Sequence, residues 1–224
     1  MATAGADGLV LLWDVHRRQP IRRIQERVTV DDVGLSPNGK MLAVTTGAQR
    51  GEGTVELCSV PRLILEARLA APWGQWGRFS PDGHLFVVAD HEGRLRLFDT
   101  RTWKPRSRPM NTGTSEILSL AIAADGRSLA TTSLGGAPRL WDLTSDPPTS
   151  EPLPGPHRLR SAAAFVQGAT RLVIAYDDGR AVQWDVRPSA WAARACSEAD
   201  RTLTPDEWTN ALPARPYAPA CRTR

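Results

Sequence analysis

Short apolar runs alternate with turn-forming residues along most of the chain. Apolar runs that follow a turn at 41–44, 85–88 and 172–175 are typical of buried β-strands. We expect the next strands at 9–15, 95–98 and 181–186. A further strand precedes each turn at 30–35, 75–79, 117–122 and 162–166, and weaker outer strands are predicted at 21–24 and 63–69. The chain is therefore predicted to be all-β, built from short strands.

Two sets of turn signals separate these strands. The first set places a glycine at positions 39, 83, 126 and 168, twice within a Ser-Pro-x-Gly tetrapeptide. The second set is an acidic residue or glycine followed by glycine, at 7–8, 52–53, 92–93, 135–136 and 178–179. Because glycine tolerates positive φ, both sets predict tight hairpin turns.

A third marker, an aromatic residue followed by Asp, recurs in phase with the turns. It occurs as Trp13-Asp14, Phe98-Asp99, Trp141-Asp142 and Trp184-Asp185, and Cys58-Ser59 fills the gap in the series. The period is about 43 residues with four short strands in each unit, which is the pattern of a β-propeller blade.

These residues resemble the WD40 repeat family over roughly residues 1–187. The Gly-His signature of that family is nearly absent, so we expect blades that are held together mainly by apolar packing. The resemblance implies one partial version of the family's hydrogen-bond network, formed by His157, Asp178 and Trp184.

The expected domain 1–187 divides into a partial blade and four complete ones. The partial blade spans 1–27, and the others span about 28–69, 73–109, 116–153 and 160–187. The partial blade lacks its innermost strand and the last blade lacks a clear outer strand. We therefore expect an incomplete or open propeller, the C-terminal part of a longer protein. The competing interpretations are a small closed propeller of four or five blades and closure by self-association.

Residues 188–224 form an expected helical and Pro-rich tail. Ser189 is a candidate cap for a helix over 190–199, and Thr204 with Glu207 forms the capping-box pattern of a second helix start. The tail resembles the segment that follows WD40 propellers in large actinobacterial sensor proteins, which often carry an upstream NTPase or kinase module. The sequence itself contains no phosphate-binding loop motif.

The chain has three cysteines, and the two in the tail allow three interpretations. Cys196 and Cys221 are either two partly buried small hydrophobes, a disulfide that clamps the tail, or metal ligands; the last is weakest, because no His or second Cys lies at ligand spacing beside either one. Cys58 takes the place of a blade aromatic and is predicted to be core.

Charge and candidate chemistry add little to this picture. The net charge is +4 and the basic residues are scattered, which favours a solvated surface over a nucleic-acid interface. The repeated Asp residues follow the fold period, so we assign them a structural role and predict no catalytic residue, cofactor site or metal site. No apolar run approaches the ~18 residues needed to span a membrane, and no secretory signal is visible. Trp73 and Trp76 have two interpretations, a partner contact and ordinary inter-blade packing.

We therefore expect a cytoplasmic, non-catalytic WD40 scaffold that binds protein partners as the sensor part of a larger signalling protein. The rigid ring of loops on a propeller is suited to such binding. The alternatives are a lactonase-type propeller hydrolase and weak nucleic-acid binding through surface arginines, whose affinity would fall steeply with salt.

Overall fold

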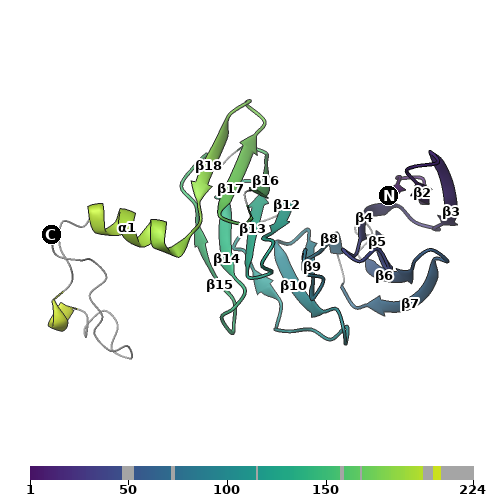
Figure 1. Ribbon diagram of the computed structural model, residues 1–224, viewed down its shortest axis with the longest axis horizontal. Helices are drawn as coiled ribbons and strands as arrows, with labels where there is room; N and C mark the ends of the chain where they lie inside the picture. The colour runs from purple at the N-terminus through teal and green to yellow at the C-terminus, as the bar shows by residue number, and fades with distance from the viewer. Residues whose placement is uncertain are drawn as a thin grey trace.

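A computed structural model describes residues 1–46, 53–71, 74–114, 116–156, 159–166, 168–198 and 204–207. These residues form an all-β structure of five antiparallel sheets with three or four strands each, followed by one helix (Figure 1). The all-β class that the sequence predicts is confirmed.

Each sheet is a meander of consecutive strands. The first sheet contains β1 (Ala2–Ala4), β2 (Leu9–Asp14) and β3 (Gln19–Gln25). The second contains β4 (Val30–Leu35), β5 (Met41–Thr46), β6 (Thr54–Ser59) and β7 (Ile64–Leu69). The third contains β8 (Gly74–Phe79), β9 (Leu85–Asp90), β10 (Arg94–Asp99) and β11 (Met110–Asn111). The fourth contains β12 (Ile117–Ile122), β13 (Ser128–Ser133), β14 (Arg139–Asp142) and β15 (Thr149–Pro152). The fifth contains β16 (Ser161–Val166), β17 (Arg171–Tyr176) and β18 (Ala181–Asp185).

The turns between strands have the chemistry that the sequence indicates. All four glycines of the first turn set adopt positive φ, among them Gly39 at 68°, and so do Gly8, Gly93 and Gly179 of the second set. In the turn at 135–136 the residue with positive φ is Gly135 and not Gly136. In two of these turns a serine hydroxyl accepts a hydrogen bond from the first backbone N–H of the next strand. Met41 donates to Ser36 and Leu85 donates to Ser80, both at 2.9 Å. These hydroxyls satisfy buried backbone groups that the turn would otherwise leave without a partner.

The five sheets follow one another in chain order across the molecule, from the first sheet near the N-terminus to the fifth sheet beside α1 (Figure 1). The first strands of neighbouring sheets lie side by side, because β4 contacts β8, β8 contacts β12 and β12 contacts β16. The second, third and fourth sheets therefore each present one face to the sheet before them and the opposite face to the sheet after them.

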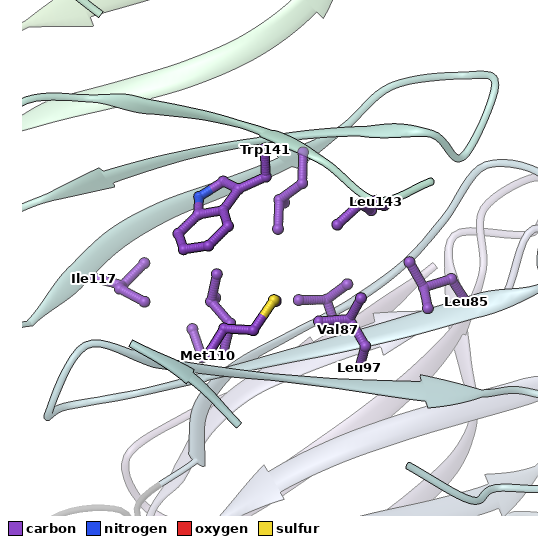
Figure 2. Close-up of a cluster of buried hydrophobic side chains, with 10 residues drawn as sticks. Leu85, Val87, Leu97, Met110, Ile117, Trp141 and Leu143 are labelled. Atoms are coloured by element: carbon purple, nitrogen blue, oxygen red, sulfur yellow. The ribbon is translucent and has the colours of Figure 1, made fainter. Parts of the chain in front are cut away.

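The core consists of four apolar clusters, one at each junction between neighbouring sheets. Figure 2 shows the cluster at the junction of the third and fourth sheets, where Trp141 of β14 points toward Met110 and Ile117. At the preceding junction the largest fully buried side chain, Phe86, packs against Phe79 with 4.7 Å between ring centroids. Burial between sheets, at roughly 25 cal/mol per Å² of apolar surface, is the main source of stability in such a chain.

The appendage begins with α1 (Pro188–Glu198), close to the helix predicted at 190–199. The predicted capping box is present: the Glu207 N–H donates to Thr204 Oγ1 at 3.3 Å, and the Thr204 N–H donates to Glu207 Oε2 at 2.9 Å. The third sheet extends to Asn111, two residues beyond the unit boundary predicted at 109, because the short β11 pairs with β10. No described helix is long and apolar enough to cross a membrane.

Candidate interaction groove

The repeated aromatic position occupies the same place in successive sheets. Trp141 is buried and its indole N–H donates to Thr131 Oγ1 at 3.0 Å, and Trp13 makes the matching bond to Thr3 Oγ1 at 2.8 Å. Phe98 is also buried at this position. In the fourth sheet the aromatic residue therefore joins the third strand to the second, and its ring faces the junction with the third sheet. In the first sheet it joins β2 to β1.

The Asp residue that follows each aromatic residue closes a turn. Asp99 and Asp142 accept backbone hydrogen bonds from Thr102 and Thr144, both at 2.8 Å, and each also binds the hydroxyl of that threonine. These threonines hold the pKa of both carboxyls below the usual range, since their hydrogen bonds favour the charged form.

Asp185 has the most strongly shifted carboxyl of the series. Arg187 donates its side-chain and backbone N–H groups to the carboxylate, which lowers the pKa of Asp185 to about 2. Asp14 binds the backbone N–H groups of His16 and Arg17 at 3.0 Å each. All four Asp residues of the repeat thus bind the turn that follows them, which is a structural role.

A groove of about 750 Å³ lies where the fourth and fifth sheets meet α1. Trp141 and Trp191 contribute aromatic surface to its lining, and Arg127 and Arg187 contribute guanidinium groups. Trp191 lies near the start of α1 and is 36% exposed. Its indole N–H donates to the backbone carbonyl of Asp185, the last residue of β18. This contact ties α1 to the end of the fifth sheet.

A second pocket of about 600 Å³ lies at the outer end of the third and fourth sheets. It shares Trp141 and Ser150 with the groove, and its remaining lining includes Met110 and Pro147. Ser150 accepts a hydrogen bond from Arg139 Nε at 3.0 Å, and the Arg139 guanidinium lies 5.8 Å from the Trp141 ring centroid. We call the two pockets together the rim groove.

The rim groove does not include Trp76, one of the two tryptophans that the sequence singled out as candidate partner contacts. Trp76 lies on β8, where it packs against the cluster between the third and fourth sheets, and the Arg78 guanidinium lies 5.8 Å from its ring centroid. Its indole N–H is buried without a hydrogen-bond partner. Trp73 lies outside the described residues, so its role stays a prediction.

The hydrogen-bond network implied by the family resemblance also stays a prediction. The Trp184 indole N–H is buried without a partner, and Asp178 binds Arg180 through the backbone N–H at 3.0 Å and the side chain. His157, the third member, lies outside the described residues.

The cysteines divide between core and tail. Cys58 is a free thiol and only 2% exposed. Its pKa is raised to about 11, mainly by burial and to a smaller extent by the nearby negative charge of Glu56. Cys196 is disulfide-bonded. Cys221 lies outside the described residues, so the predicted pairing of Cys196 with Cys221 stays a prediction.

The structure reveals two ionic clusters that sequence reasoning missed, one around a buried carboxylate and one partly buried between two sheets. Asp90 is fully buried and accepts hydrogen bonds from Arg94 Nε at 3.0 Å and Arg96 Nη1 at 2.9 Å. Asp32 of the second sheet binds Arg78 and the Gly77 N–H of the third. Burial raises the pKa of Asp32, and Arg78 opposes that shift. A signal for the first cluster was present, since Asp90 ends an otherwise apolar strand and arginines follow at 94 and 96.

Within the described parts of the chain, no group of three or more His, Cys, Asp or Glu residues is arranged to hold a metal ion. The rim groove remains the feature best suited to contact another molecule. No protein-family model matches the chain, and no curated protein matches it significantly.

Proposed function

We propose that this chain is a WD40-type β-propeller scaffold, non-catalytic and cytoplasmic, that binds a protein partner through the rim groove. In this proposal the binding event is relayed to an enzymatic module, of NTPase or kinase type, within a larger signalling protein. A rigid framework of packed sheets positions the loops and the helix that contact the partner.

Support for the propeller assignment comes from the equivalence of the sheets. The Trp13–Thr3 and Trp141–Thr131 hydrogen bonds join equivalent residues of two sheets. The first strands of sheets two to five lie side by side, as blades do around a common axis. The middle three sheets have four strands each, in sequential order from the first strand outward.

The single observation that carries the binding proposal is the composition and position of the rim groove. Trp and Arg are the residue types most enriched among the side chains that dominate the binding energy at protein interfaces. Here the partly exposed Trp191, the exposed Arg127 and the buried Trp141 line one concave surface. The groove fits a loop or peptide that places an apolar side chain against the exposed Trp191 indole and an acidic group near Arg127 or Arg187.

The experiment that tests this function compares partner capture by three forms of the chain. Immobilised wild-type protein, Arg127→Glu and Ile64→Ala are incubated with extract from the native cells, and the bound proteins are quantified by mass spectrometry. Ile64 lies on β7, far from the groove along the row of sheets, and is 52% exposed, so it serves as the matched control. We expect one protein to bind the wild type and the control but not Arg127→Glu.

Calorimetry with that purified partner then measures the contribution of Trp191. We expect Trp191→Ala to weaken binding by about thirtyfold, which corresponds to the ~2 kcal/mol threshold of an interface hot spot. Trp191→Phe, which keeps an aromatic ring, should lose less. Equal affinity of all three proteins for every captured partner would refute the assignment of the groove.

A further inference from the structure

The first sheet carries an apolar face that no other described element covers. Side chains alternate along β2, so that Val10 and Leu12 are buried against the second sheet while Leu9, Leu11 and Trp13 lie on the opposite face. These three residues are only partly buried. The first sheet stands at the end of the row, with the second sheet on its other side (Figure 1).

This uncovered face carries leucine at a position that is charged in three of the four equivalent sheets. The strand register makes Leu11, opposite Thr3, equivalent to Glu56 opposite Val44, to Arg96 opposite Val88 and to Arg139 opposite Thr131. In the fifth sheet the equivalent residue is Val182, which packs at the junction with the fourth sheet. The fifth sheet therefore shows that an apolar side chain at this position is suited to a covered face. Arg23 opposite Leu11 and Gln25 opposite Leu9 place polar side chains beside the apolar residues of the first sheet, as at the border of an interaction site.

The internal junctions show what covers an equivalent face. At the junction of the second and third sheets, Phe86 and Phe98 pack against a face that includes Ala43. At the junction of the fourth and fifth sheets, Leu172 and Trp184 pack against a face that includes Ala130. The face that carries the repeat aromatic therefore meets a sheet face with small apolar side chains, so that large groups fill the space that small ones leave.

The chain itself presents one such face without a covering element among the described residues. On the fifth sheet, the register places Ala164 opposite Val173, and Ala162 and Ala181 on either side of Ala175. Four of these five residues are exposed and Val173 is partly buried. The remaining members of this face are Val166, Arg171, Gln183 and Asp185. By register, Val173 and Ala164 are equivalent to Ala130 and Ala121, which pack at the junction with the fifth sheet.

We propose that the first sheet of one copy binds the fifth sheet of a second copy, head to tail, through these two faces. The contact continues the series of sheet junctions within each chain and buries Leu9, Leu11 and Trp13 against the alanine- and valine-rich face. Because the two surfaces differ, the association is heterologous and can extend to a ring or to a longer assembly. This inference does not depend on the rim groove.

The test measures the mass of the full chain by sedimentation velocity across a wide concentration range. Leu11→Arg places on the first sheet the residue that the third and fourth sheets carry at this position, so it is compatible with the fold. Ala164→Arg blocks the fifth sheet, and Ile64→Arg is the control at an exposed position outside both faces. Circular dichroism melts verify that every variant is folded.

We expect the wild type and the control to form species of at least twice the monomer mass as concentration rises, and each of the two face variants to stay monomeric. An equimolar mixture of Leu11→Arg and Ala164→Arg retains one intact pair of faces, so it should form a one-to-one dimer and nothing larger. A wild-type chain that is monomeric at every concentration would overturn the proposal, as would a mixture of the two variants that does not associate.

Discussion

Gly77 and Phe86 interlock at the junction of the second and third sheets, and a pair of substitutions tests this packing. A Cβ atom on Gly77 would lie 2.7 Å from Phe86 Cζ and 3.3 Å from Thr45 Oγ1. The glycine has no positive φ, so the contact with Phe86, and not backbone strain, excludes a side chain there. The register makes Gly77 equivalent to Val33 of the second sheet and Ala163 of the fifth. A side chain at this position is therefore compatible with the repeat.

The magnitude follows from the crowding at Phe86. Gly77→Ala inserts one methyl group into a closed contact, which costs about 1–3 kcal/mol of unfolding free energy. Phe86→Leu introduces the residue that the other sheets carry at Leu42, Leu129 and Leu172, at a cost of about 1–2 kcal/mol for lost volume and ring contacts. Leucine lacks the ring atom that meets the new methyl group. The double variant should therefore lose about 1–2 kcal/mol less unfolding free energy than the two single variants lose together.

The assay is urea unfolding of the wild type, both single variants and the double variant, monitored by tryptophan fluorescence. We expect equal m-values and a favourable coupling energy between the two sites. Strictly additive losses, or a Gly77→Ala variant as stable as the wild type, would refute the close contact between Gly77 and Phe86.

The remaining predictions concern three other sites. Asp185 has a folded-state pKa of about 2, below its ordinary value of 3.8, so its ion pair with Arg187 stabilises the fold above pH 3.8 and loses that effect as pH falls toward 2. Asp185→Asn should therefore lower the melting temperature at neutral pH, and the gap to the wild type should close near pH 2. Trp141→Phe should cost about 1–2 kcal/mol in urea unfolding, because it leaves buried Thr131 without its donor. Cys58, with a pKa of about 11, should resist alkylation in the native chain at neutral pH and react with Ellman's reagent after unfolding.

The strand positions were predictable because turns and apolar runs encode them locally. The strands predicted at 30–35 and 117–122 match β4 and β12 to the residue. Glycine at a position that requires positive φ fixes where each hairpin reverses, and the period of about 43 residues repeats the pattern. The third sheet runs two residues past the approximate boundary at 109, because β11 carries only Met110 and Asn111, too short for a periodic signal.

The rim groove was not predictable from the same information. The groove combines Arg127 from the turn before β13, Trp141 from β14 and Trp191 from α1. Only the packing of the fourth and fifth sheets brings these three residues together. Trp76 was a candidate partner contact in the sequence, yet its ring packs against the cluster between the third and fourth sheets. Sequence spacing identifies which residues share a strand face, but not which faces enclose a surface between two sheets.

Site-specific photo-crosslinking at Thr149 tests the claim that the rim groove is the partner-binding surface most directly. Thr149 lines the groove and is exposed, so a photoreactive residue placed there reaches a bound partner without filling a core site. The same residue at position 64 on the outer strand of the second sheet is the control. We predict a crosslink to one protein in the native cells from position 149, absent from position 64 and lost on adding Arg127→Glu. The same crosslinks from both positions, or a crosslink at 149 that survives Arg127→Glu, would contradict the claim.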